Sequence, residues 1–337
     1  MNRTTLRLLA IVLAVLVGAL LFVESGDDGD LPESGALLFP ELRAVANDIS
    51  RLTITRAGQD PLEIVRQDGA WRLPDRGGYP ARTEAIRAVV LAMTEATVVE
   101  PKTANPELHA RLGVDRPDGE LSKGVLIEAS AGDQSFDLVF GNVAQGAYRY
   151  ARIAGDDQSW LIDQNPEIPL DVADWLVTDI VDIDSSSVRS ARITHADGEV
   201  IAISKGVPED TNFDVADIPD GRELTYTTVA NGIGGALNDL DLDDVRASQP
   251  VDQPAVVSVF ETFDDTRITA TVYPSDDGNW VEFAVESTGD DSTAADELGA
   301  RVDGWQYRIA DYKASLLTRR WEDILEPLPD EASEEHK

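Results

Sequence analysis

Apolar and polar residues follow two different patterns along this chain, and the first is a single apolar run. Residues 8–23 contain no charged side chain, and Arg3 and Arg7 precede them. As a helix this run would be about 24 Å long, slightly shorter than a hydrocarbon core of about 30 Å. The positive-inside rule predicts a transmembrane signal-anchor over residues 1–24, with a cytoplasmic N-terminus. A cleaved signal peptide is the alternative, although residues 23–25 make a poor cleavage site.

Beyond this run, short segments alternate between apolar and polar residues, and the series of segments occurs twice. One copy opens at 52–55 and the other at 191–194, and each turns at a glycine into a second strand. The same alternation predicts further strands at 62–65, 71–73, 97–99, 125–127, 136–140, 148–151 and 160–162, and in the second copy at 200–203, 212–215, 240–242, 255–260, 267–273 and 280–285.

Helical spacing of apolar residues predicts helices at matching places in the two copies. These helices are expected at 86–93 and 171–183 in the first copy, and at 229–237 and 311–325 in the second. The first copy also inserts a short helix, with Asn105 as its N-cap, Pro106 at its first position and Gly113 after its last turn. The second copy has a helix at 294–303 instead.

Together these elements predict an α+β fold. The expected order is an N-terminal transmembrane helix and then two tandem repeated units, each a mostly antiparallel sheet with covering helices. The expected boundaries are a membrane anchor at 1–24, a flexible acidic tether at 25–47, repeat units at 48–184 and 185–326, and a disordered acidic tail at 327–337.

Composition narrows the range of partners and of chemistry. The chain has 63 acidic and 28 basic residues, a formal net charge of −35 and no cysteine. Such a charge disfavours nucleic acid and anionic lipid surfaces as partners. Because cysteine is absent, disulfide bonds and thiol catalysis are excluded. The acidity itself is typical of a well-solvated surface or of adaptation to salt.

Motifs for catalysis, nucleotides or metals are incomplete in this sequence. Gly141–Gly146 lacks the Lys-Ser/Thr of a phosphate loop and is interpreted as a hairpin turn. Gly232–Gly235 falls in a predicted helix, where glycine allows close packing. His109, His195 and His336 lack metal or nucleophile spacing, and the acidic runs lack the calcium-loop pattern. We therefore expect no cofactor, no metal and no catalytic residue.

Basic residues are concentrated near the C-terminus of this acidic chain. Arg308, Lys313, Arg319 and Arg320 fall close together in sequence and are candidate residues for docking a partner. The alternative is that they form ion pairs with the abundant carboxylates of the chain itself.

Several segments resemble a bacterial family of proteins, the domain-of-unknown-function family numbered 4340. The segments that carry the resemblance are residues 101–108, 159–163, 169–176, 261–264, 304–309 and 311–313. The resemblance implies an inner-membrane protein with a periplasmic body, and related regions accompany ABC-type export systems of the gliding-motility kind. It implies no catalytic residues.

The expected function combines the predicted anchor, the repeat and the implied family. We expect a non-catalytic, membrane-tethered periplasmic accessory or binding protein of an envelope ABC-type transport system. It would be a single-pass protein of the bacterial inner membrane whose partner is a permease or ATPase complex, and it would not bind nucleic acid. Two alternatives remain: an envelope hydrolase that uses carboxylates in an interdomain cleft, and a structural spacer.

Overall fold

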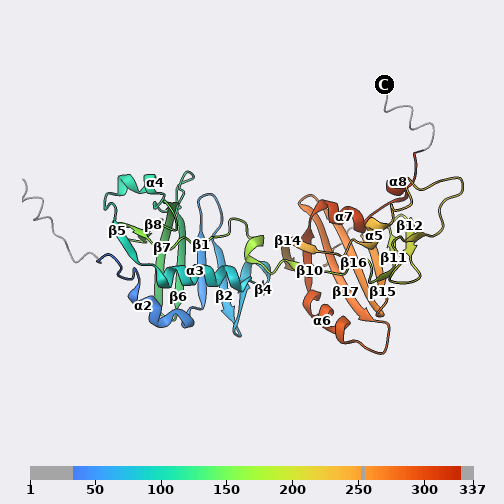
Figure 1. Cartoon of the computed structure of the whole chain (residues 1–337), viewed down its shortest axis with the longest axis horizontal. Helices are drawn as coiled ribbons and strands as arrows, with labels where there is room; N and C mark the ends of the chain where they lie inside the picture. The colour runs from blue at the N-terminus through green and yellow to red at the C-terminus, as the bar shows by residue number, and fades with distance from the viewer. Residues whose placement is uncertain (1–32, 252–254, 328–337) are drawn as a thin grey trace, which may run out of the picture. The chain divides into compact units, whose positions relative to one another are not determined.

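The computed structural model describes residues 33–251 and 255–327, and these form two mostly antiparallel nine-stranded sheets with few helices (Figure 1). The α+β class is therefore confirmed. Within the described residues, no helix is long and apolar enough to cross a membrane. The predicted anchor at 8–23 lies outside these residues, as do residues 25–32 of the predicted tether and 328–337 of the predicted tail. The rest of the tether, residues 33–47, is described and holds a short helix at Pro40–Val45, in which Leu42 is fully buried.

The first sheet follows the order β4-β3-β2-β1-β6-β7-β8-β9-β5. Its strands are β1 (Arg51–Thr55), β2 (Leu62–Gln67), β3 (Ala70–Leu73), β4 (Tyr79–Pro80), β5 (Val98–Pro101), β6 (Val125–Ala131), β7 (Gln134–Val143), β8 (Arg149–Ile153) and β9 (Ser159–Ile162). Alternate residues of its strands are buried, as in β6, where Ile127 and Ala129 are fully inaccessible. This alternation is the period of two that the sequence displays.

The second sheet follows the order β10-β14-β18-β17-β16-β15-β11-β12-β13. Its strands are β10 (Asp179–Val181), β11 (Val188–Thr194), β12 (Val200–Ser204), β13 (Asp214–Val215), β14 (Leu240–Ala247), β15 (Val256–Thr262), β16 (Thr266–Ser275), β17 (Gly278–Ser287) and β18 (Trp305–Ile309). Read in the reverse direction, the strands β13-β12-β11-β15-β16-β17-β18-β14 follow the same order as β3-β2-β1-β6-β7-β8-β9-β5 of the first sheet. Each sheet has one further edge strand, β4 or β10.

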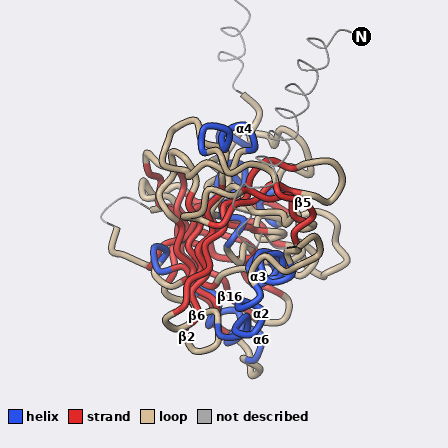
Figure 2. Tube along the Cα trace, turned by 90° about the vertical axis from the view of Figure 1, so that its left-hand side faces the viewer, coloured by secondary structure: helices blue, strands red, loops and turns tan. Residues whose placement is uncertain are grey.

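Most of the helices are short, and strands hold more of the described residues than helices do (Figure 2). The α-helices are α2 (Pro40–Val45), α3 (Thr83–Glu95), α4 (His109–Leu112), α5 (Asn231–Gly234), α6 (Thr293–Val302), α7 (Asp311–Leu317) and α8 (Trp321–Ile324), and the 3-10 turns are η1 (Ala46–Asp48), η2 (Pro74–Arg76), η3 (Pro106–Leu108) and η4 (Ala173–Trp175). The prediction for 105–113 is confirmed: the Asn105 side chain accepts a hydrogen bond from the Glu107 N–H, and Gly113 closes α4 at φ +68°.

Three predicted helices are wrong in whole or in part. The segment predicted helical at 171–183 holds only η4 and then β10, because its β-branched residues pair with β14. At 229–237 only the single turn α5 forms, since three glycines weaken a helix there. The helix at 311–325 is broken into α7 and α8. The Arg320 N–H donates to the Asp323 carboxylate at 2.8 Å and starts α8 anew.

By internal contacts the chain separates into two compact units. The first comprises the chain up to Pro61 together with Ala88–Pro166, and the second comprises Leu62–Arg87 and the chain from Glu167 onward. The domain boundaries expected from the repeat, at 48–184 and 185–326, remain a prediction.

Candidate functional site

The hairpin that joins β15 to β16 has a rigid turn. The Thr262 hydroxyl oxygen accepts a hydrogen bond from the Thr266 N–H at 3.0 Å and contacts the Asp264 carboxylate. Asp265 adopts φ +59°, a left-handed conformation that aspartate tolerates better than most residues. Its carbonyl accepts hydrogen bonds from both the N–H and the hydroxyl of Thr288. These bonds fix the position from which the Asp265 side chain projects.

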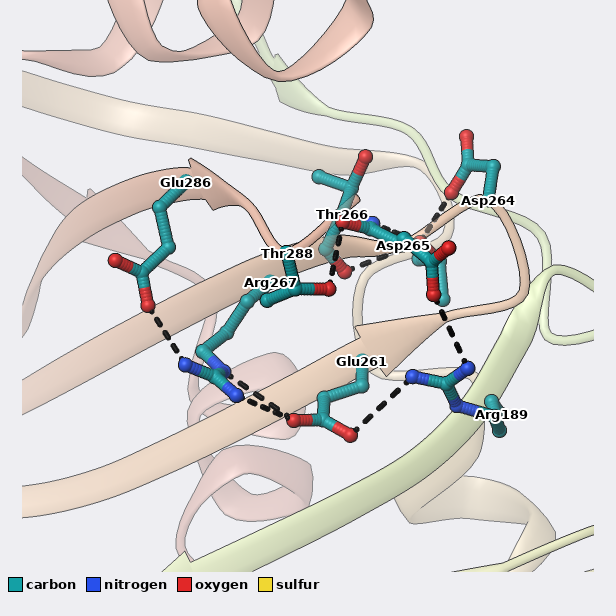
Figure 3. Close-up of polar contacts among 9 residues, drawn as sticks. Arg189, Glu261, Asp264, Asp265, Thr266, Arg267, Glu286 and Thr288 are labelled. Carbon is teal, nitrogen blue, oxygen red and sulfur yellow. Dashed lines mark hydrogen bonds and ion pairs between the residues drawn. The ribbon is translucent and has the colours of Figure 1, made fainter. Parts of the chain in front are cut away.

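Next to this turn, charges of opposite sign alternate across four neighbouring strands (Figure 3). We call this set the charged row: Arg189 of β11, Glu261 of β15, Arg267 of β16 and Glu286 of β17, together with Asp265. Glu261 receives Arg267 at 2.8 Å and Arg189 at 3.5 Å on its two carboxylate oxygens. Arg267 also reaches Glu286 at 2.9 Å, and Arg189 reaches Asp265 at 3.3 Å. Each arginine therefore bridges two carboxylates.

Strand register explains why three of these side chains meet. Glu261 is directly opposite Arg267, and Arg267 is directly opposite Glu286, so the three lie on one face of the sheet. The hydrogen bond from Arg267 is the main reason that the pKa of the Glu261 carboxyl lies below its usual value. Bonds to Glu261 and Glu286 raise the pKa of the Arg267 guanidinium. Both shifts favour the charged forms of Glu261 and Arg267.

The charged row presents fixed charges to solvent. The Glu286 and Asp265 side chains are the most exposed, at 63% and 50%, and Glu261 is the least exposed, at 31%. Ion pairs this exposed contribute little to stability, typically below about 1 kcal/mol each. Their effect is to hold long side chains in one arrangement at the surface of the second unit.

One known protein family matches this chain. The family model described as "Domain of unknown function (DUF4340)" matches residues 71–258, more than half of the sequence. The chain belongs to the DUF4340 family. No curated protein and no solved structure matches it. Within the charged row, Arg189 falls inside the matched residues, and the other four members follow them.

The DUF4340 chain does not present its C-terminal basic residues as one exposed patch. Lys313 is only 7% exposed, and its ammonium group donates to the carbonyl of Asn238. Burial lowers the pKa of Lys313, against the opposing influence of nearby aspartates, chiefly Asp239. Arg308 is a half-buried residue of β18. A docking role for these two residues stays a prediction, and Lys313 does not lie at the surface where a partner would meet it.

Arg319 and Arg320 instead take part in internal ion pairs. The Arg320 guanidinium lies 2.8 Å from both Asp197 and Glu199, which belong to the turn between β11 and β12. These contacts raise the pKa of Arg320. Arg319 lies 4.0 Å from Asp323, one helical turn ahead. The alternative of internal pairing therefore describes both arginines, while their part in docking stays a prediction.

The two histidines within the described residues have structural partners. His109 is buried, and its Nε2 lies 2.8 Å from the carbonyl of Asp157, so the ring ties α4 to the β8–β9 turn. His195 is also buried, and its Nε2 lies 3.0 Å from the carbonyl of Arg319. His336 lies outside the described residues. Within 33–251 and 255–327, no group of three or more acidic or histidine side chains is arranged to hold a metal ion.

A cleft of about 510 Å³ lies beside α6 in the second unit. Three carboxylate residues line it, Glu282 from β17 and Asp296 and Asp303 from α6 and its C-cap, together with Tyr273. Burial, and to a lesser extent Glu282, raises the pKa of the Tyr273 hydroxyl. The Glu282 carboxylate accepts a hydrogen bond from Ser248 at 2.8 Å. The cleft brings acidic groups together without a positively charged lining residue.

The sequence patterns did not predict that the five residues of the charged row lie together. Its members are separated by up to 97 positions, and each looks like an ordinary surface charge in its own strand. The alternation of β15 and β16 and the short turn between them could have suggested that Glu261 faces Arg267. The positions of Arg189 and Glu286 depend on the strand order, which local patterns do not reveal.

Proposed function

We propose that this DUF4340 protein is a non-catalytic, membrane-tethered periplasmic accessory subunit of an envelope ABC-type transport system. In this proposal it binds its partner through the charged row of the second unit. The observation that carries the proposal is the row itself, in which Arg189 and Arg267 hold three carboxylates in one arrangement at the surface. Preorganised charges of this kind favour specific recognition and correct orientation of a protein partner.

Sequence features support the tether and the compartment. An uncharged run at 8–23 follows Arg3 and Arg7, and every acidic residue lies after it. This distribution favours a signal-anchor with the body of the protein outside the cytoplasm. The implied relationship to regions that accompany ABC-type exporters supports an inner-membrane partner.

The chemistry of the row indicates what kind of surface it would meet. It has three carboxylates and two guanidinium groups, and Glu286 and Asp265 are its most exposed members. A partner surface that places Arg or Lys side chains opposite these two carboxylates would complete the alternation of charge. The net charge of −35 would also steer the protein toward cationic surfaces.

In-cell crosslinking of the full-length chain, followed by purification in mild detergent, tests this proposal. We expect an ABC-type permease or ATPase to be recovered with the native chain. Glu286→Arg should reduce that recovery strongly, because it reverses the most exposed charge of the row. Asp133→Lys, an exposed charge reversal in the β6–β7 turn of the first unit, is the matched control and should leave recovery unchanged.

A second arm addresses the basic residues. Arg319→Glu with Arg320→Glu should reduce recovery only if these residues also contact the partner. The proposal fails if the native full-length chain is found entirely in the soluble fraction and recovers neither permease nor ATPase. It also fails if Glu286→Arg and Asp133→Lys lower recovery equally.

An envelope hydrolase is the second candidate, here with its carboxylates in the cleft beside α6 of the second unit rather than in the interdomain cleft expected from the sequence. Carboxylates in such a cleft can serve as general acid and general base. The hydrolase hypothesis predicts that the purified protein cleaves an envelope polysaccharide. It also predicts that Glu282→Gln or Asp296→Asn abolishes this cleavage. Absence of any cleavage by the native protein would remove this candidate.

A further inference from the structure

A second pocket, in the first unit, has a lining that combines positive charge with apolar side chains. Its volume is about 320 Å³, and its lining residues are Lys102, Thr103, Leu108, Arg111 and Leu112. They come from the segment that includes η3 and α4. Residues 102–124 connect β5 to β6, whereas only residues 248–255 connect β14 to β15, the strands at matching places in the second sheet.

Hydrogen bonds hold the strand side of this pocket in place. The N–H of Lys102 donates to the carbonyl of Ser159 at 2.8 Å, and the N–H of Ser159 donates to the carbonyl of Thr103 at 2.8 Å. The Ser159 hydroxyl, which is fully buried, lies within hydrogen-bonding distance of both the N–H and the carbonyl of Thr103. Residues 102–103 are therefore fastened to the end of β9.

The helical side of the pocket is fastened as well. The contact between buried His109 and the Asp157 carbonyl holds α4 against the β8–β9 turn. Gly113 ends the helix where a Cβ would lie 2.7 Å from the Asn142 side chain, so only glycine fits there without displacement. With both walls fixed, the pocket is preformed, as ligand sites usually are.

The two basic residues of the pocket, Lys102 and Arg111, differ in whether a carboxylate contacts them. Lys102 contacts the Glu100 carboxylate and lies 5.7 Å from the centre of the Tyr150 ring. The exposed Arg111 side chain, in contrast, makes no hydrogen bond or ion pair with any residue of 33–251 or 255–327. Although acidic residues outnumber basic ones by 63 to 28, none of the described carboxylates neutralises the Arg111 guanidinium beside the pocket.

We propose that this pocket binds a small amphiphilic anion, a carboxylate that bears a short aliphatic chain. The planar guanidinium of Arg111 would receive the carboxylate through paired hydrogen bonds. The Thr103 hydroxyl lies on the same lining and can donate one more. Leu108 and Leu112 would cover the aliphatic chain, which removes apolar surface of both ligand and protein from water. The site is independent of the charged row.

Calorimetric titration of the full-length protein in detergent with octanoate tests this proposal. Acetate tests whether the aliphatic chain of the ligand is needed, and octylammonium tests whether the negative charge of the ligand is needed. We expect saturable binding of octanoate that is at least about tenfold weaker in Arg111→Gln, the usual effect of losing a charged hydrogen-bonding partner. Arg87→Gln is the matched control, because Arg87 is an exposed arginine of α3 that does not line the pocket.

Hydrogen exchange locates the binding. Octanoate should slow amide exchange within residues 102–112, and Leu108→Ala, which removes a pocket-lining side chain that does not pack on the core cluster beneath Leu112, should weaken binding while leaving the thermal unfolding midpoint close to that of the native chain. Three outcomes would overturn the proposal: no saturable octanoate binding, octylammonium binding as tightly as octanoate, or Arg111→Gln and Arg87→Gln binding alike.

Discussion

At the scale of single residues, Gly234 shows that close packing can require one particular amino acid at a position. A Cβ at this position would lie 2.2 Å from a ring atom of Phe213, which is itself buried. The interpretation of the glycines at 232–235 as packing residues is borne out at Gly234, although the helix predicted around them is reduced to one turn.

We expect Gly234→Ala to lower the free energy of unfolding by about 2 kcal/mol, because the rigid Phe213 ring must move. Urea unfolding followed by tryptophan fluorescence measures this change. Gly235→Ala is the control: its nearest neighbour would be the Asn231 carbonyl at 3.4 Å, and its φ of −95° suits alanine. The control should be neutral or stabilising by up to about 1 kcal/mol. Equal losses in the two variants would contradict the packing argument.

Residue type alone was also a poor guide to chemistry. His109, His195 and Lys313 are residues that often catalyse or bind, yet each is buried and bonded to a backbone carbonyl. The capped helix around 105–113 could be predicted because caps are local signals. The bond from a histidine to a carbonyl 48 or 124 positions away could not be, since it depends on the packing of distant segments.

At the scale of elements, β10 and β14 meet with like charges opposite each other. Asp179 of β10 is directly opposite Asp241 of β14. Burial, and then the charge of Asp179, raise the pKa of the Asp241 carboxyl. Like charges at directly opposed positions destabilise a strand pair. This pairing went unpredicted, because the segment containing β10 shows helical spacing of its apolar residues.

We expect Asp179→Asn to stabilise the protein by about 0.5 kcal/mol at pH 7 and low salt. The pKa of Asp241 is higher in the folded state, so the folded state binds more protons just above pH 3.8. The contribution of Asp241 to stability therefore falls as pH rises through this range, and this contribution should fall less in the variant. Urea unfolding between pH 4 and pH 7 measures it. Asp243→Asn, an exposed neighbour in β14, should not change the pH dependence.

At the scale of the whole molecule, net charge dominates the electrostatics. A formal charge of −35 on 337 residues produces self-repulsion in the folded state, and salt screens it. The charged row and the Arg320 contacts are attractive, and salt weakens them. Because acidic residues outnumber basic ones more than twofold, repulsion should outweigh attraction.

We expect the thermal unfolding midpoint to rise by several degrees between about 20 mM and 0.5 M NaCl, as screening removes this repulsion. Differential scanning calorimetry measures the midpoint. Choline chloride serves as the control, since equal effects of the two salts identify screening rather than binding of sodium. A midpoint that falls with salt would mean that attractive ion pairs control the stability.

By itself the sequence determined the α+β class, the family, most strands, the capped turn at 105–113 and the apolar run at 8–23. These features depend on periodicity, caps and composition, which act over a few neighbouring residues. Only the tertiary structure decided the edge strand β10, the break between α7 and α8, the burial of Lys313 and the charged row. Strand order and register bring together residues far apart in the chain, and no local pattern specifies which distant strand lies alongside another.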